Sequence, residues 1–255
     1  FYSVIFSPSH LSLIKDGPAV RRRFLDTALC QLKPKYSEYL RKYNRILLQR
    51  NAVLKDIGFN SELYDILDSW DYQLARYGAA VLNERLKYLN ILSEYCQEIY
   101  AGISDNKEML SVKYSLPQTE NENLSFESLF LMEAEMIKKA RKEDIINKTT
   151  SVGPHRDDME ILINGRSARS FGSQGQQRSC ALALKLGEAA LIEKDALEQP
   201  VILLDDVMSE LDTLRQDYIL NHIKERQVFI TCCEPSSVLR MCSGKTFNIE
   251  KGRLS

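Results

Sequence analysis

Two adjacent carboxylates, Asp205 and Asp206, directly follow an apolar run at Val201–Leu204. A continuous apolar run is typical of a strand that is buried on both faces, and ligands bind at the carboxyl ends of such strands. Two carboxylates at that place can divide the work, because one can hold Mg²⁺ through water while the other orients or deprotonates an attacking water. On these residues alone, a strand-end turn with two solvated acids remains the alternative.

A second candidate lies about thirty residues earlier, in the segment SQGQQRS at 173–179. Ser173 can cap a helix, and Gly175 lets the backbone approach a ligand closely. The N-terminus of a helix binds anions through its free N–H groups and its dipole, although an ordinary capped helix is the simpler interpretation of this turn alone. The order of this turn, the Asp-Asp strand and the segment SELD at 209–212 indicates a nucleotide site.

A loop that would hold the phosphates is not visible beside these residues. The segment GKT at 244–246 is a poor P-loop, because Leu239 stands where the first glycine is required and the following residues favour a strand rather than a helix. We therefore expect the nucleotide to bind mainly to a segment outside these 255 residues. We also expect this chain alone neither to hydrolyse ATP nor to bind it tightly.

The elements that must position these residues follow from the hydrophobic periodicity. Apolar residues recur at helical spacing from Pro18 to about residue 101, which predicts two helical blocks separated by a turn at Gly58 and Asn60. The second block has Ser61 as a plausible N-cap and Gly102 as a plausible stop. The segment 149–172 alternates in short pieces around a hairpin turn at 164–165. The other expected elements are strands at 2–7, 109–116, 200–205, 227–231 and 245–250, and helices at 123–148, 174–194, 212–225 and near 236–241. Strand–helix–strand order near the C-terminus predicts a parallel sheet in an α/β layer.

Charge is distributed unevenly along the chain. Residues 15–55 contain 11 Lys and Arg against three acids, whereas the whole chain has a net charge of −1. Such a basic segment predicts a surface that faces a polyanion. If the polyanion is DNA, cations interleaved with three tyrosines suit neutralising its phosphates without reading bases. The candidate DNA-contacting residues are Arg21, Arg22, Arg23, Arg41, Lys42 and Arg45, and the tyrosines are Tyr36, Tyr39 and Tyr43. In the RRR segment at 21–23 we expect at least one arginine to pair locally instead.

The loop VGPHRDD at 152–158 contains His155 and Arg156. We expect His155 to order this loop, because no metal-ligand cluster accompanies it, and Arg156 to contact a phosphate or an interface.

These segments together resemble the RecF family of DNA-repair proteins, which have ABC-type ATPase heads. The resemblance lies in FSPSHLSLIKDGPAVRRRFLD, QRNAVLK, VGPHRDD, GSQGQQRS and LLDDVMSELD, which are spread over residues 6–212. It implies an α/β ABC-ATPase-like lobe with a mixed sheet and an inserted, mainly helical arm domain. The lobe would comprise 1–14 and 148–255, and the arm (lobe II) 15–147.

The resemblance also implies the role of each site residue. Asp205 stands at the Walker B magnesium position, and Asp206 at the position of the catalytic carboxylate. The signature motif, which touches the γ-phosphate held by the opposite subunit, corresponds to Ser173, Gln174, Gly175 and Gln176. Ser209 and Asp212 stand in the D-loop at the dimer interface. The sequence departs from the family pattern at Gln174, where glycine is usual, and at Cys232, where a γ-phosphate-sensing histidine is common; the second departure predicts slow hydrolysis.

By this resemblance the complete protein is a weak ATPase that uses ATP and Mg²⁺, forms an ATP-sandwiched homodimer on DNA and works with RecO and RecR in loading recombinase. The resemblance further implies that the protein is cytoplasmic and that it acts in DNA replication, recombination, repair and the SOS response. The partner segment would be an N-terminal piece that carries the P-loop. The alternative is a non-enzymatic helical interaction or DNA-binding module in which the Asp-Asp strand is structural.

Composition agrees with this setting. Hydrophobic residues make up 44% and charged residues 27%, and no apolar run approaches the ~20 residues that would span a bilayer. The six cysteines show no zinc spacing, so we expect free thiols in a reducing compartment. The first residues, FYSVIFSP, predict a strand rather than a signal peptide, as in a piece of a longer protein.

Overall fold

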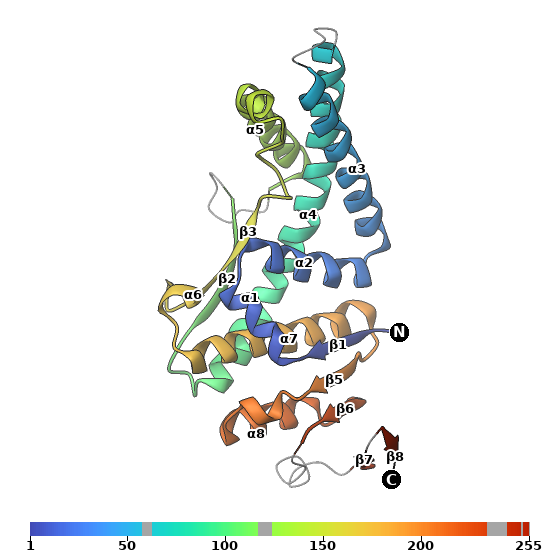
Figure 1. Ribbon diagram of the computed structural model, residues 1–255. Coiled ribbons are helices and arrows are strands. Elements are labelled where there is room, and N and C mark those ends of the chain that lie inside the picture. The colour runs from blue at the N-terminus through green and yellow to red at the C-terminus, as the bar shows by residue number, and fades with distance from the viewer. Residues whose placement is uncertain (58–62, 117–123, 234–243, 251, 255) are drawn as a thin grey trace.

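The computed structural model describes residues 1–57, 63–116, 124–233, 244–250 and 252–254. The helices are α1 (Ser12–Lys15), α2 (Pro18–Leu32), α3 (Pro34–Asp56), α4 (Leu63–Ile103), α5 (Phe126–Asn147), α6 (Ala168–Phe171), α7 (Gln174–Ala196) and α8 (Thr213–Ile223), with 3₁₀ turns η1 (Pro8–Leu11) and η2 (Met208–Glu210). The strands are β1 (Ser3–Phe6), β2 (Leu110–Ser115), β3 (Asp158–Ile163), β4 (Arg166–Ser167), β5 (Val201–Asp205), β6 (Val228–Thr231), β7 (Ile249–Glu250) and β8 (Arg253–Leu254). Helices α3 and α5 with the N-terminal part of α4 form one end of the molecule, and the β1–β5–β6 sheet with α7 and α8 forms the other (Figure 1).

The predicted parallel sheet is present, with strand order β1-β5-β6. Ile202 and Leu204 of β5 lie beside Val4 and Phe6 of β1, and these four side chains are buried. Alternate residues point to opposite faces of a strand, so all four belong to the face that packs on the hydrophobic core. This sheet brings the carboxyl ends of β5 and β6 to one edge.

Helix α4 connects the two ends of the molecule. Its 41 residues correspond to about 60 Å, and it packs against α3 and α5 at one end and α7 at the other. It continues one residue past the predicted stop at Gly102. Because Gly102 has no side chain, the ring of Tyr218 from α8 can pack directly against the helix there. One hydrophobic core includes residues of both the arm and the lobe.

A separate antiparallel sheet, β2-β3-β4, joins the two predicted domains. Strand β2 comes from the arm sequence and pairs along its whole length with β3 of the lobe sequence. The β3–β4 hairpin turns at Asn164 and Gly165, which have φ of 49° and 75°, as the predicted Asn-Gly turn requires. The predicted boundary at 147/148 therefore does not coincide with a break in packing.

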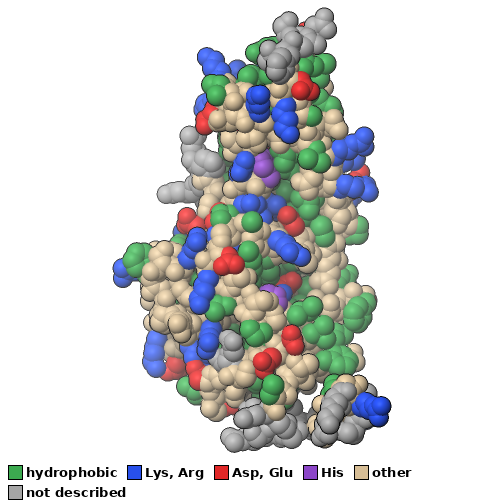
Figure 2. All heavy atoms as spheres, in the orientation of Figure 1, with side chains coloured by type: hydrophobic (Ala, Val, Ile, Leu, Met, Phe, Trp, Pro, Cys, Tyr) green, Lys and Arg blue, Asp and Glu red, His purple; other side chains and the backbone are tan. Residues whose placement is uncertain are grey.

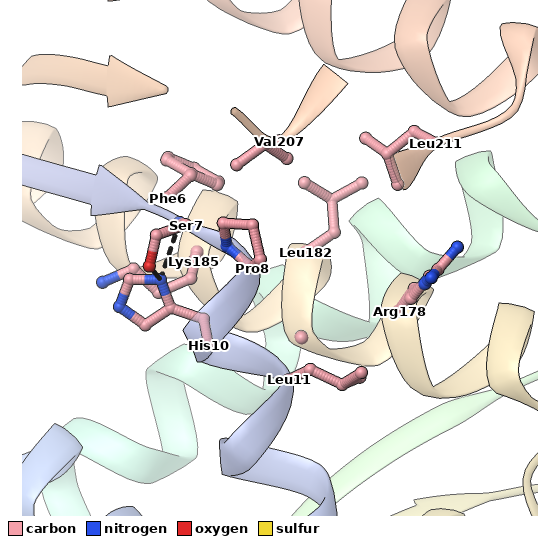
Figure 3. A pocket seen from close by; sticks show the side chains of 11 residues that line it. Phe6, Ser7, Pro8, His10, Leu11, Arg178, Leu182, Lys185, Val207 and Leu211 are labelled. Atoms are coloured by element: carbon pink, nitrogen blue, oxygen red, sulfur yellow. Dashed lines mark hydrogen bonds between the residues drawn. The ribbon is translucent and has the colours of Figure 1, made fainter. Parts of the chain in front are cut away.

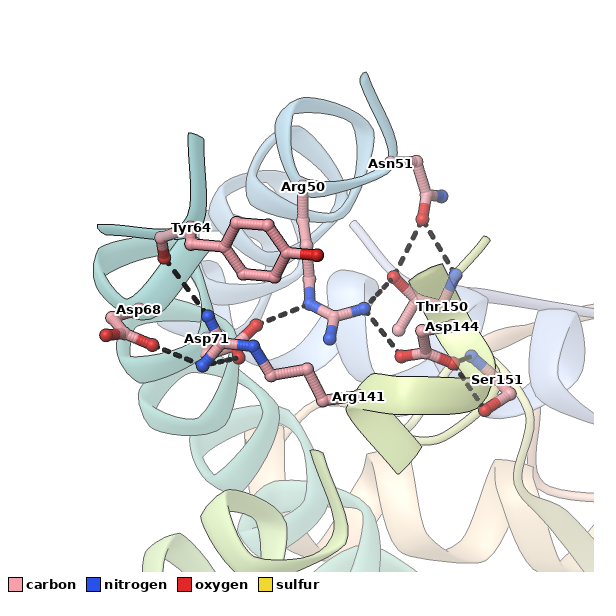
Figure 4. Close-up of polar contacts among 9 residues, drawn as sticks. All are labelled: Arg50, Asn51, Tyr64, Asp68, Asp71, Arg141, Asp144, Thr150 and Ser151. Carbon is pink, nitrogen blue, oxygen red and sulfur yellow. Dashed lines mark hydrogen bonds and ion pairs between the residues drawn. The ribbon is translucent and has the colours of Figure 1, made fainter. Parts of the chain in front are cut away.

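A buried polar network holds the arm together (Figure 4). Arg50 of α3 is fully buried and contacts Asp71 of α4 at 2.6 Å and Asp144 of α5 at 2.7 Å. Arg50 also donates to Thr150 Oγ1 at 2.8 Å, and the Thr150 hydroxyl donates to Asn51 Oδ1 at 2.7 Å. One guanidinium therefore ties three helices and the segment after α5 into a fixed arrangement.

Some predictions fall outside the described residues, namely the turn at Gly58 and Asn60, the cap at Ser61 and the helix near 236–241. The strand expected at 245–250 is present only as β7, which pairs with β8. The five cysteines that the structure describes are free, as expected; Cys96 and Cys180 are buried, whereas Cys30 is half-buried and Cys232 and Cys233 are exposed. None of the described helices combines the length and the apolar character needed to cross a bilayer.

Candidate nucleotide-binding site

The two aspartates lie at the exposed carboxyl end of β5, where Thr231 of the neighbouring strand β6 holds them. Asp205 is aligned with Thr231, whose hydroxyl donates to Asp205 Oδ1 at 2.8 Å. The backbone N–H of Asp206 donates to Thr231 Oγ1 at 3.1 Å and to its carbonyl at 3.2 Å. We did not predict this role of Thr231 from the sequence. Its position at the end of the next parallel strand is the signal that could have indicated it.

Asp206 adopts a left-handed backbone conformation, with φ of 51°. Such a conformation is uncommon for a residue other than glycine, although aspartate tolerates it better than most, and it is concentrated at functional sites. The hydroxyl of Ser209 lies 3.1 Å from Asp206 Oδ1 and 2.9 Å from its carbonyl oxygen. Ser209, predicted to belong to the D-loop, therefore orients the Asp206 carboxylate within the same chain.

The donor set fits magnesium bound together with a nucleotide. Within the described residues, no three His, Cys, Asp or Glu side chains come together as a metal site. Mg²⁺ usually takes one or two carboxylates, several waters and substrate phosphates, so a single exposed carboxylate suffices. Asp205 meets this condition, since Thr231 occupies only its Oδ1 oxygen.

The signature segment forms a capped helix start. Ser173 Oγ accepts from the N–H of Gln176 at 3.2 Å, and the N–H of Ser173 donates to Gln176 Oε1 at 2.7 Å, which completes a capping box. Gln176 Nε2 also donates to Glu108 Oε1 at 2.6 Å. The Gln176 side chain is therefore engaged within the chain, while Ser173 and Gln174 are exposed.

Arg215 of α8 joins the signature helix to the D-loop. Asp212, the N-cap of α8, accepts from the N–H of Arg215 at 3.0 Å and forms an ion pair with its guanidinium. Arg215 Nε donates to Ser179 Oγ at 2.8 Å, and the Ser179 hydroxyl donates to the Gly175 carbonyl at 3.0 Å. Arg215 was not among the predicted site residues, although its spacing three residues after the cap could have indicated the bond to Asp212.

A small hollow lies beside this edge of the sheet (Figure 3). Its lining includes Ser7, His10 and Lys185 on one side and Val207 and Leu211 on the other. Its volume of about 50 Å³ is far below the ~300 Å³ or more of pockets that enclose small ligands. The hollow is therefore too small to enclose a nucleotide by itself.

The GKT segment does not have the geometry of a P-loop. Residues 244–248 form no regular element, and the β7–β8 hairpin follows them where a P-loop would lead into a helix.

The predicted DNA-contacting residues are divided by the fold. Arg21 is buried, with 5% exposure, and its guanidinium binds Asp158 at 2.7 Å, so its prediction as a DNA contact is corrected. Arg22 donates to the Asp157 carbonyl at 2.7 Å, whereas Arg23 is exposed. Local pairing in the RRR segment is therefore confirmed.

On α3, Arg41 and Arg45 are exposed, whereas Lys42 pairs with Glu38 at 2.6 Å. Tyr36 and Tyr43 are buried and cannot contact DNA, which corrects the expectation that they belong to the surface.

His155 orders its loop as predicted. Its Nδ1 accepts from the Tyr43 hydroxyl at 2.7 Å, and its Nε2 lies 3.2 Å from the Thr150 carbonyl, so Nε2 carries the proton. Burial lowers the pKa of His155 to about 4, and the ring is neutral near pH 7. Arg156 is exposed and reaches the Thr150 carbonyl at 3.4 Å.

Comparisons with known proteins identify the family. The chain is 44% identical over 253 residues to the DNA replication and repair protein RecF of Agathobacter rectalis, covering 98% of this chain and 67% of that protein. The RecF proteins of Lachnoclostridium phytofermentans and Acetivibrio thermocellus are 45% and 42% identical, with 61% and 63% of their lengths covered. The chain belongs to the RecF family.

Solved structures of RecF agree with this assignment. The recombination mediator RecF with ATPrS aligns over all of this chain and 67% of that chain, with 37% identity and a TM-score of 0.90. The structure of RecF with ATP gives a TM-score of 0.89 at 37% identity and covers 68% of that chain. The predicted RecF-type α/β lobe with a helical arm is thus confirmed, with its parallel and antiparallel strands in separate sheets. No family model matches the chain. The chain spans about three fifths to two thirds of the length of its RecF relatives.

Proposed function

We propose that this chain supplies the Walker B pair, the signature motif and the D-loop of a RecF-type ATPase. In this proposal the complete protein binds Mg·ATP, closes as a dimer on DNA and helps to load recombinase with RecO and RecR. The similar solved structures are those of RecF with ATPrS and with ATP in the RecFOR pathway, which supports the nucleotide and these partners.

The distance between the signature and the Walker B pair supports the dimer. Helix α7 is 23 residues long, about 35 Å; four residues separate it from β5, which runs back beneath it for about 17 Å (Figure 1). Ser173 therefore lies well beyond Asp205 along this direction, on the order of 17 Å by the same rises. One γ-phosphate cannot touch both residues of the same chain, but a second subunit can supply the missing helix N-terminus.

In this proposal the site residues have separate tasks. Bound Mg·ATP supplies the phosphate that is transferred to water. Asp205 holds the magnesium side of the nucleotide through water, and Asp206, oriented by Ser209, positions the attacking water. Ser173 and the first N–H groups of α7 bind the γ-phosphate of the partner subunit's nucleotide. Arg215 then links that contact to the D-loop at Asp212.

A P-loop from another part of the complete protein completes this proposal. An exposed helix end contributes only about 0.3–1 kcal/mol to anion binding, whereas micromolar affinity requires about 8 kcal/mol. The two aspartates repel the nucleotide unless magnesium intervenes. We therefore expect tight ATP binding only when the phosphate-holding segment is present.

The Ser173→Arg variant of the complete protein tests the signature in trans. The added bulk and charge block the partner's γ-phosphate, so ATP binding should remain nearly intact while ATP-dependent dimerisation, measured by light scattering, is lost. Ser125→Arg is the matched control, because Ser125 also caps a long helix through its side chain and is exposed. A Ser173→Arg variant that dimerises normally with ATP would contradict the assignment.

A further inference from the structure

The side chain of Glu108 connects the start of the signature helix α7 with the last turns of α4. Its Oε1 accepts from Gln176 Nε2 at 2.6 Å, and its Oε2 accepts from the Tyr100 hydroxyl at 2.7 Å. Glu108 lies between α4 and β2 and was not among the predicted site residues. Figure 2 shows side chains of both charge signs at the surface where α4 ends and α7 begins, in the lower left of this view.

Glu108 decides which end of the Gln176 amide faces Ser173. The backbone N–H of Ser173 is a donor and requires the amide oxygen, whereas the Glu108 carboxylate is an acceptor and requires the amide nitrogen. The orientation in the structure satisfies both groups, since Gln176 Oε1 lies 2.7 Å from the Ser173 nitrogen while Nε2 donates to Glu108. Exchanging the two ends of the amide would break both bonds. The capping box at the start of α7 therefore depends on Glu108.

This arrangement leaves a set of donors at the start of α7 available to a ligand. Ser173 Oγ accepts from the N–H of Gln176, and none of the described residues accepts the Ser173 hydroxyl proton. The first backbone bond of the helix runs from the N–H of Gln177 to the Ser173 carbonyl, so the N–H groups of Gln174 and Gly175 have no partner within the helix. The hydroxyl and these two N–H groups can together bind a phosphate.

Glu108 is itself held by groups on both sides along the chain. The Ser104 hydroxyl donates to the Glu108 carbonyl at 3.3 Å. The next residue, Met109, donates its N–H to Asn164 Oδ1 and accepts from the Asn164 N–H, each at 2.8 Å. Burial, reinforced by the hydrogen bond to Glu108, raises the pKa of Tyr100 far above its usual range, so the phenol stays a donor at neutral pH. The carboxylate therefore reaches the start of α7 from a fixed position.

We propose that Glu108, anchored by Tyr100, is a positioning residue for the signature motif. Through the Gln176 amide it keeps the donors at the start of α7 in the arrangement that binds the γ-phosphate of the partner subunit's nucleotide. Glu108 acts through Gln176 and does not touch the nucleotide. This inference rests on the function proposed above, in which α7 binds across the dimer.

The test measures ATP-dependent dimerisation of the complete protein by light scattering over a range of protein concentrations. Glu108→Ala should weaken the dimer about 25-fold, because a helix-capping interaction changes an equilibrium about fivefold and a symmetric dimer loses it twice. Binding of ATP to the variant's own subunit, measured by calorimetry, should be unchanged. The control Glu94→Ala removes the same charge from an exposed site on α4, and this variant should dimerise normally.

Two further variants separate positioning from a general loss of stability. Glu108→Gln keeps an oxygen that accepts from Gln176 and offers an amide nitrogen to the Tyr100 oxygen, so this variant should dimerise nearly as the wild type does. Gln176→Ala removes the group through which Glu108 acts. The double variant Gln176→Ala/Glu108→Ala should therefore dimerise no worse than Gln176→Ala alone, whereas independent losses of stability would add.

Several results would overturn the inference while leaving the proposed function intact. One is normal ATP-dependent dimerisation of Glu108→Ala, and another is an equal loss in the Glu94→Ala control. Additive losses in the double variant, or a Glu108→Gln dimer as weak as that of Glu108→Ala, would also contradict it. By contrast, a wild-type protein that remains monomeric with ATP would refute the proposed function itself.

Discussion

We expect the folded chain to lose stability as the pH rises toward 8, because the carboxyl group of Glu133 on α5 is buried. Its side chain is buried, with 2% of the residue exposed, and Oε2 has no hydrogen-bond partner within the described residues. A Cβ placed on Gly78 of α4 would lie 2.9 Å from that oxygen, so the carboxyl is pressed against the neighbouring helix. Burial, reinforced by the nearby Asp157, raises the pKa of Glu133 from 4.5 to about 8.

The sign of the effect follows from proton binding. Because the pKa of Glu133 is higher in the folded state, the folded chain holds a proton that the unfolded chain has already lost between pH 4.5 and 8. Stability from this group is therefore fully present below pH 4.5 and falls as the pH rises through 8. Each pH unit costs about 1.4 kcal/mol, so the interval from 6.5 to 8 costs about 2 kcal/mol. His155 changes stability in the opposite direction, but its pKa of about 4 limits that change to pH values below 6.5.

The variant Glu133→Gln isolates this contribution, because glutamine keeps the shape and removes the titration. Urea unfolding, followed through the single tryptophan Trp70 on α4, should show the wild type losing about 2 kcal/mol more than the variant between pH 6.5 and 8. Glu135→Gln is the control, since Glu135 lies on the same helix but is exposed and pairs with Lys139. If the curves of wild type and Glu133→Gln run parallel across this interval, the buried carboxyl is not protonated and the reasoning fails.

Two further variants address the nucleotide site and the arm. In the complete protein, Asp205→Asn should weaken magnesium-dependent ATP binding, whereas Asp206→Asn should spare binding and slow hydrolysis; equal effects on ATP affinity, measured by calorimetry, would contradict this division of roles. Asp144→Ala should lower the free energy of unfolding by about 3–5 kcal/mol, because it leaves the Arg50 guanidinium buried without one of its two carboxylates; a loss below about 1 kcal/mol in urea unfolding would show that Asp71 alone compensates the charge.

Several features of this protein could be predicted from the sequence because they depend on neighbours within a few residues. The apolar run before Asp205 specifies a buried strand, and Ser173 with Gln176 three residues later specifies a capped helix start. The Asn164–Gly165 pair specifies a hairpin, because both residues tolerate positive φ. In each case the backbone geometry of a short segment is sufficient, so the pattern and the element correspond.

The tertiary structure alone decided which charged residues face solvent. Arg21 and Arg23 are two residues apart in the same basic run, yet Arg21 is buried because its partner Asp158 lies 137 positions away along the chain. Counting charges within the segment 15–55 cannot reveal a partner so far away in the sequence, and so it cannot predict that Arg21 is buried. Thr231 acquires its role in the same way, since only the parallel pairing of β5 with β6 brings its hydroxyl to Asp205. Local patterns determine where strands and helices begin, whereas burial and pairing of a polar side chain depend on groups that folding brings together from distant parts of the sequence.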